Sequence, residues 1–131
     1  MEFFFVDPET GKCEFDPDKI VTGAEALFQR FAFCYLAHMM SPVMEDFAEN
    51  PANSEWGKFQ TGDDKTKEDY IRRWLKATEE FIKENQYMVP SDEKLASLEI
   101  NSITISEDTI TGNITLHTET GESISGVIPA A

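Results

Sequence analysis

The chain has 131 residues, of which 25 are acidic and 11 are basic, so its formal net charge is −14 at pH 7. This length suits a single domain, residues 1–131, and the 40% of hydrophobic residues, ten Phe among them, argue against a disordered chain. The acidic balance opposes direct binding to nucleic acid and to anionic membranes, whereas it permits basic protein partners. The sequence contains no run of about 18 apolar residues, so no transmembrane helix is predicted. The N-terminus lacks the basic start and the long apolar region of a signal peptide.

Residues 1–20 are predicted to form a short N-terminal hairpin or arm. The segment "EFFFV" (2–6) has the aromatic and β-branched content of a strand. The segment "DPETGK" (7–12) is typical of a turn, because proline presets φ and glycine accepts positive φ. The segment "CEF" (13–15) can then return as a second strand.

Residues 21–86 are predicted to be the helical part. Thr22-Gly-Ala-Glu25 matches a capping box at the start of "AEALFQRFAFCYLAHMM" (24–40), which predicts a helix that is apolar nearly all round. Such a helix is buried on more than one side, either as the central helix of a small domain or with one face covered by a partner protein. We favour the partner, because 131 residues can hardly cover every side of the helix. Ser41-Pro42 predicts a break, because both residues favour a new helix start, and a short helix over "VMEDFAEN" (43–50).

The clearest amphipathic helix is "DDKTKEDYIRRWLKATEEFIKEN" (63–85), after a predicted loop over 50–62. Its first turns are acidic, where the helix dipole favours negative charge. Its later glutamates fall on a solvated face and do not indicate a catalytic pair. The apolar stripe follows the spacing i, i+3, i+4, i+7 and comprises Ile71, Trp74, Leu75, Thr78, Phe81 and Ile82.

Residues 95–129 change to the two-residue period of strands. Three alternating segments rich in Ile, Thr and Ser predict an antiparallel meander. The alternation slips at Asn101-Ser102, which predicts a β-bulge. Gly112 and Gly126 fall on the apolar phase, which indicates either a bulge that twists the sheet or the close approach of another backbone or helix. The predicted fold is therefore α+β: two main helices plus a short helix, a C-terminal three-stranded antiparallel meander and a short N-terminal hairpin.

The residues that usually carry chemistry are sparse. Cys13 and Cys34 are the only cysteines, and with no secretory signal we expect them to be reduced thiols. His38 and His117 are the only histidines and lie far apart in the sequence. No phosphate-binding loop, nucleophile elbow or metal-ligand spacing is present. We therefore predict no catalytic residues, no metal and no cofactor.

The order of the elements from Val21 to the end resembles a known family. "VTGAEALFQRF", "EDYIRRWLKATEEFI" and "LEINSITISEDTITGNITLHTETGE" together are similar to the small baseplate wedge proteins of contractile phage tails and related injection particles, the sheath-initiator family. The matching positions are Gly23, Ala26, Gln29 and the "T-x-x-G" of Thr118 to Gly121. The Glu-Pro-Arg signature of many members has its nearest counterpart in Val89-Pro90-Ser91, which lacks the arginine, so its role is not carried over.

The resemblance implies a structural function. Members of the family sit in the virion tail baseplate in several copies around the tail tube and offer strands that sheath protein extends. For this chain it implies other baseplate and sheath proteins as partners, after synthesis in the bacterial cytoplasm. The pairing is β-augmentation, in which an open sheet edge binds a partner strand, and the candidates for that edge are Ile114, Leu116, Ile124, Val127 and Ile128. A second set is either core or a contact with wedge helices: Leu27, Phe31, Tyr35 and Trp74.

The net charge of −14 also supports an alternative, an acidic inhibitor that occupies a basic nucleic-acid-binding surface of another protein. Such a mimic would gather its acids on one face, whereas here they are spread from Glu2 to Glu122. A small enzyme is a third class, for which the sequence offers no constellation of residues.

Overall fold

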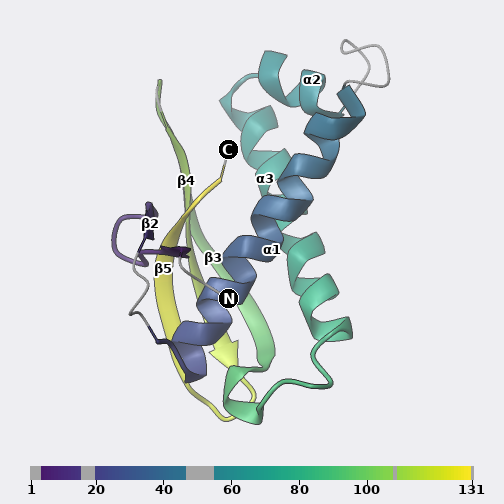
Figure 1. Ribbon diagram of the computed structural model, residues 1–131. Helices are drawn as coiled ribbons and strands as arrows, with labels where there is room; N and C mark the ends of the chain where they lie inside the picture. Colours follow the sequence, from purple (N-terminus) through teal and green to yellow (C-terminus); the bar gives the residue numbers. More distant parts are fainter. Residues whose placement is uncertain (1–3, 16–19, 47–54, 108, 131) are drawn as a thin grey trace.

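A computed structural model describes residues 4–15, 20–46, 55–107 and 109–130. Helices α1 and α3 lie side by side on one face of a three-stranded sheet, and a small hairpin lies beside the edge of that sheet (Figure 1). This is the α+β fold expected from the sequence. In chain order the elements are β1 (Phe4–Val6), β2 (Cys13–Phe15), α1 (Gly23–Asp46), α2 (Glu55–Thr61), α3 (Asp64–Glu84), the 3-10 turn η2 (Ser91–Glu93), β3 (Leu95–Ile105), β4 (Ile110–Thr118) and β5 (Ser123–Pro129).

The C-terminal sheet is the predicted antiparallel meander, with the order β3-β4-β5 and β4 in the centre. A register shift between Ile100 and Ser102 confirms the bulge expected at Asn101-Ser102. The outer face of the sheet is polar. On it the Asn101 side-chain amide donates hydrogen bonds to Asn113 Oδ1 at 3.1 Å and to Thr115 Oγ1 at 2.8 Å. The inner face carries the buried side chains of β4 and packs against the helices.

Helix α3 agrees with the predicted amphipathic segment. The Asp63 carboxylate caps its start by accepting a hydrogen bond from the Thr66 N–H at 2.8 Å, and this bond lowers the pKa of the carboxyl. The predicted stripe is buried with one exception. The Phe81 side chain is 46% exposed, because it lies on the flank of α3 that faces outward beside α1.

Helix α1 differs from the sequence prediction, because it runs without a break through Ser41-Pro42 to Asp46. Proline at this position removes one helical N–H, but the helix continues on both sides of it. The short helix lies instead at α2, inside the segment 50–62 that was expected to be a loop. Phe59 of α2 is 3% exposed and its ring lies 5.1 Å from that of Trp74, so a tertiary contact stabilises this short helix.

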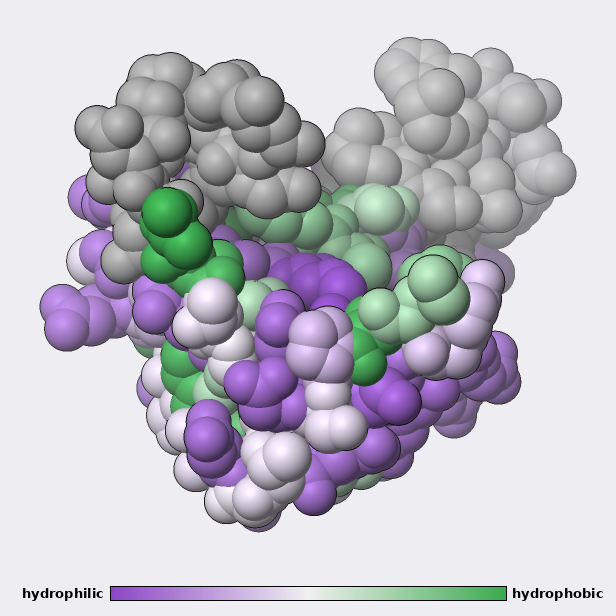
Figure 2. Space-filling view, turned by 60° about the horizontal axis from the view of Figure 1, so that its bottom comes forward, coloured by the Kyte–Doolittle hydropathy of each residue, from purple (hydrophilic) through white to green (hydrophobic). Residues whose placement is uncertain are grey.

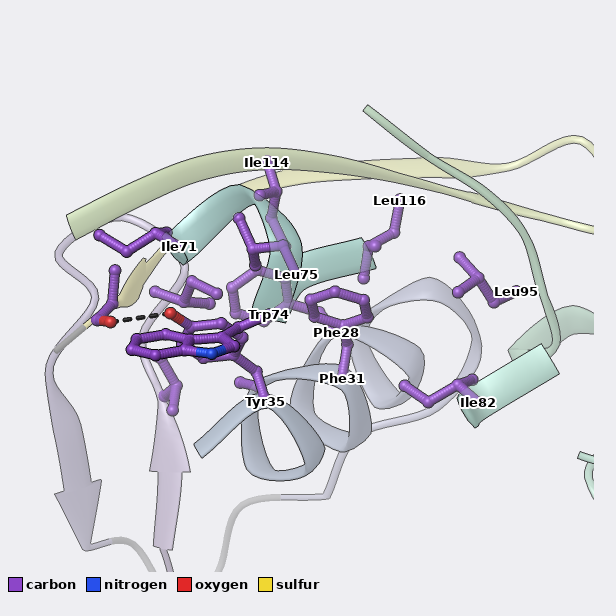
Figure 3. Close-up of a cluster of buried hydrophobic side chains, with 14 of the residues drawn as sticks. Phe28, Phe31, Tyr35, Ile71, Trp74, Leu75, Ile82, Leu95, Ile114 and Leu116 are labelled. Atoms are coloured by element: carbon purple, nitrogen blue, oxygen red, sulfur yellow. Dashed lines mark hydrogen bonds between the residues drawn. The ribbon is translucent and has the colours of Figure 1, made fainter. Parts of the chain in front are cut away.

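The hydrophobic core is one cluster between the two long helices and the sheet (Figure 3). Tyr35 is buried within it, and its hydroxyl donates a hydrogen bond to the carbonyl oxygen of Ala130 at 2.7 Å. Helix α1 contacts α2, α3, β1, β4, β5 and η2. Most sides of this apolar helix are therefore covered by the chain itself, where the sequence had suggested a partner.

The N-terminal hairpin pairs β1 with β2 in antiparallel register, as expected for the described part of residues 1–20. Residues 1–3 and 16–19 of that arm lie outside the described residues. The Gln29 side chain of α1, 7% exposed, holds the hairpin by both ends of its amide. Its Oε1 accepts from the Val6 N–H and its Nε2 donates to the Val6 carbonyl, each at 2.7 Å.

Candidate strand-edge interface

Three of the five residues predicted to form a partner-binding edge lie in the core instead. Ile114 and Leu116 belong to β4, which is paired on both sides, and both side chains are fully buried. Ile128 of β5 is 1% exposed and also faces the helices. We therefore revise the assignment of these three residues. Ile124 and Val127 are half-buried and lie in β5, which is an edge strand of the sheet.

The hydrogen bonds of β5 show which of its backbone groups face outward. Residues of an antiparallel strand direct their N–H and C=O groups alternately toward the partner strand and away from it. The Ala130 N–H donates to the Ile110 carbonyl of β4 at 2.8 Å, whereas the Val127 N–H donates to the Pro8 carbonyl at 2.8 Å. Even-numbered residues of β5 therefore pair with β4, and the backbone groups of Ser123 and Ser125 point outward.

The N-terminal turn covers the remainder of this edge. The Pro8 carbonyl oxygen accepts a hydrogen bond from the Val127 N–H. Gly11 also packs against Val127, so closely that a Cβ atom on it would lie 2.9 Å from Val127 Cγ1. Gly11 has a φ of 72°, which glycine adopts without strain. Pro129 has no N–H to offer. The accessible stretch of the β5 edge is therefore Ser123–Ser125, where both serines are exposed.

The opposite edge of the sheet, β3, is covered by side chains. The Gln86 amide accepts from the Leu95 N–H at 2.8 Å and donates to the Leu95 carbonyl at 3.0 Å. The Glu79 carboxylate of α3 accepts from the Leu98 N–H at 2.9 Å. Beyond the bulge, the alternation directs the backbone groups of Ile103 and Ile105 outward in the same way.

The predicted helix residues are all buried in this chain. Leu27, Phe31 and Tyr35 are fully buried and Trp74 is 5% exposed, and Figure 3 shows the last three within one cluster. Burial raises the pKa of the Tyr35 phenol. The alternatives left open by the sequence, core or contact with a partner, are decided for the core, because none of these side chains reaches the surface.

Three residues that control the edges were not identified as edge residues from the sequence. Gln29 and Glu79 satisfy the backbone of strands that lie 23 and 19 residues away in the sequence, and Gln86 satisfies that of Leu95, nine residues further on. A glutamine amide carries both a donor and an acceptor, so it can match the N–H and C=O of one strand residue. No local sequence signal identifies that role, because the strand it caps is set by the tertiary fold.

The groups that could carry chemistry are isolated from one another. Within the described ranges no set of three or more His, Cys, Asp or Glu side chains is arranged to hold a metal ion. Cys13 and Cys34 are free thiols, and His117 Nε2 lies 3.0 Å from Glu99 Oε1 on the polar face of the sheet. Among the described helices, none combines the length and apolarity of a membrane span.

Comparison with known proteins adds no relative to this picture. No family model matches the chain, and neither a curated protein nor a solved structure shows a significant match.

Proposed function

We propose that the protein is a structural assembly protein that offers its C-terminal strand edge to a strand of a partner protein. The observation that carries the proposal is the outward direction of the Ser123 and Ser125 backbone groups on an exposed edge strand. An edge with unpaired N–H and C=O groups binds an added strand through main-chain hydrogen bonds.

The β5 edge suits this role better than the β3 edge. Natural proteins protect edges with bulges and covering groups, and β3 has both, a bulge after Ile100 and the caps from Gln86 and Glu79. In the accessible stretch of β5, Ser123–Ser125, the two exposed side chains are small serines. The remainder of the β5 edge, at Val127, is covered by the N-terminal turn, which limits a partner strand to the end near the β4–β5 turn.

The particle we propose is a phage tail baseplate or a related contractile injection particle. The protein would be made in the bacterial cytoplasm and assembled in several copies around a tail tube, with other baseplate proteins and sheath protein as partners. The support for this placement is the sequence resemblance described above. A first check is genomic: tail, tube and sheath genes should flank the reading frame, and unrelated neighbours would count against the placement.

Removing β5 is not a useful test, because Ile124, Gly126 and Ile128 pack inward and deletion would unfold the domain. The sharper variant is Ser125→Pro, which removes one outward N–H that β4 does not use. Its matched control is Ser125→Ala, which removes the hydroxyl bonded to Thr115 Oγ1 at 2.7 Å and keeps the N–H. Both variants are first checked for native stability by urea denaturation.

The readout is co-purification with the sheath and baseplate proteins encoded beside the gene, followed by electron microscopy of the assembly. We expect Ser125→Pro to lose the sheath partner and Ser125→Ala to keep it. The pair Ile103→Pro and Ile103→Ala tests the β3 edge in the same way. Normal assembly with Ser125→Pro, together with loss of assembly specific to Ile103→Pro, would move the proposed contact to β3.

The acidic inhibitor remains the alternative because of the net charge of −14. Exposed acids of the described chain lie on separate elements, such as Glu9 in the N-terminal turn, Asp64 at the start of α3 and Glu122 beside β5. An inhibitor's affinity for a basic surface would fall steeply with salt, whereas strand pairing depends on salt weakly. A salt titration of any complex that forms separates the two functions.

A further inference from the structure

A hydrophobic surface remains on the outer side of α1, where it meets α3 and faces away from the sheet. It contains an open hollow of about 300 Å³ lined by Cys34, Ala37, His38 and Phe81. Phe81 is 46% exposed and Phe33, on the outward side of α1, is 36% exposed. Figure 2 views the molecule from the lower end of Figure 1 and shows a largely hydrophilic surface on which hydrophobic residues form separate patches. This surface is separate from the strand edge of β5.

The walls of the hollow are formed by side chains that contact one another. His38 Nδ1–H donates a hydrogen bond to the Cys34 carbonyl oxygen at 2.9 Å, which holds the imidazole in place. The imidazole meets the Phe81 ring edge-on, with centroids 5.2 Å apart and an interplanar angle of 71°. Burial raises the pKa of the Cys34 thiol, which keeps this group neutral. The hollow therefore offers an apolar seat that exists before any partner binds.

The rim of the hollow on α3 is acidic. Glu84 follows Phe81 by three residues, so it lies beside Phe81 on the helix surface, and Glu80 lies one turn before Glu84. Both glutamates are exposed, and neither forms an ion pair with any residue in the described part of the chain. Glu68 and Glu79, by contrast, are paired with Arg72 and Lys83.

We propose that this surface is a second docking site, which binds an amphipathic basic helix of another protein. An apolar side chain of that helix would enter the hollow between α1 and α3, and its lysines or arginines would lie beside Glu80 and Glu84. The volume of about 300 Å³ is at the lower end for ligand pockets and suits one or two anchoring side chains. A second copy of this chain fits poorly, because each copy carries a net charge of −14.

The test uses two designed helical peptides of roughly 16 residues that share leucines at i and i+4. One peptide carries lysines beside the leucines and the other carries glutamates at the same positions. Binding of each labelled peptide to the full-length protein is measured by fluorescence anisotropy at two salt concentrations. We expect the basic peptide to bind at least about tenfold more tightly than the acidic one, since charge complementarity selects the partner.

Two variants separate the hollow from the overall charge of the protein. Phe81→Ser should weaken the binding of the basic peptide about tenfold, because aromatic side chains at the centre of an interface contribute much of the affinity. The matched control, Met88→Ser, removes another exposed hydrophobic side chain, 82% exposed and outside the hollow, and should leave binding unchanged. The double variant Glu80→Lys/Glu84→Lys should reverse the preference between the two peptides.

Three outcomes would overturn the proposal. Equal binding, or no binding, of the two peptides would remove the charge argument. Binding of the basic peptide that is unaffected by Phe81→Ser would show attraction to the whole acidic surface. Self-association in analytical ultracentrifugation that Phe81→Ser abolishes would identify the occupant as a second copy. None of these outcomes bears on the β5 edge, which the Ser125 variants test independently.

Discussion

The two edges of the C-terminal sheet are protected by different physical means. At β5 the cover is backbone, because the Pro8 carbonyl of the N-terminal turn bonds the Val127 N–H. At β3 the cover is side chain, because Gln86 and Glu79 bond the Leu95 and Leu98 backbone. A small sheet can thus protect its edge hydrogen-bonding groups without a further strand. A partner strand can pair with the stretch that remains uncovered, Ser123–Ser125.

The backbone cover depends on a longer chain of contacts than the side-chain cover. The turn that reaches β5 is held through β1, whose Val6 is bonded by Gln29 of α1, and through Pro8, which lies against Gly126. The caps on β3 come from α3 and the segment directly after it. We therefore expect substitutions around the β5 edge to cost more stability than those around the β3 edge.

The largest expected effect is at Gly126. A Cβ at this position would lie 2.7 Å from Phe28 Cε2 and 2.8 Å from Pro8 Cβ. Gly126→Ala should lower the free energy of unfolding by about 3 kcal/mol, because the packed ring and the turn must both move. Urea denaturation measures this loss.

Gly112→Ala is the matched control for Gly126, since the nearest side-chain atom to its added Cβ would be Ile128 Cγ1 at 3.8 Å. It should change stability by less than about 1 kcal/mol. Equal losses at the two glycines would show that the close approach at Gly126 does not matter.

The next effect is at Gln29. Gln29→Ala leaves the Val6 N–H and C=O without their buried partner and should cost about 2–3 kcal/mol. Hydrogen exchange should then accelerate at the Val6 and Val127 amides, because the turn that covers β5 is no longer held. Gln29→Glu keeps an acceptor and loses the donor, so an intermediate loss is expected. Unchanged hydrogen exchange at the Val127 amide would show that the cover of the β5 edge does not depend on the bonds between Gln29 and Val6.

The third effect is a loss of stability at alkaline pH through Tyr35, whose hydroxyl holds Ala130 just after β5. Burial raises its pKa above the ordinary value of 10.0, so above about pH 10 the unfolded chain loses this proton and the folded chain keeps it. The unfolded state then binds fewer protons, and stability falls with rising pH by up to about 1.4 kcal/mol per pH unit. In Tyr35→Phe the free energy of unfolding should not show this fall above about pH 10. The same dependence on pH in both proteins would contradict the assignment to Tyr35.

The smallest effect is at Gln86, on the β3 side of the comparison. Gln86→Ala should cost only about 1 kcal/mol, because its bonds to Leu95 are partly exposed and water can replace them. Exchange should accelerate at the Leu95 amide and remain unchanged at Val127. A loss as large as that of Gln29→Ala would mean that the two edges are protected equally.

Patterns of residues close together in the sequence predicted most of the fold correctly. The amphipathic period gave α3, and the slip in alternation gave the bulge at Asn101-Ser102. The prediction failed in two places, and at the second of them a distant contact outweighed a local preference. Helix α1 continued through Pro42, and α2 formed in an expected loop because Phe59 packs on Trp74.

The candidate site was predicted less well than the fold. The sequence located β5, but Ile114 and Leu116 were wrongly placed at the edge, although the predicted meander already puts their strand in the centre. Strand alternation shows which residues share a face, but not how completely the helices cover that face. The exposure of the Phe81 side chain was not predicted for the same reason, because Phe81 and Ile82 occupy equivalent positions on the apolar stripe.

The sequence by itself determined the α+β class, the meander and the acidic surface, since all three follow from composition and local period. It also placed glycine at 112 and 126 on the apolar phase without deciding why. Only the tertiary structure decided that Gly126 admits the Phe28 ring whereas Gly112 leaves room for a Cβ. It also decided that Pro8 covers the edge of β5 and Glu79 that of β3, because a hydrogen bond between residues far apart in sequence exists only once the chain has folded.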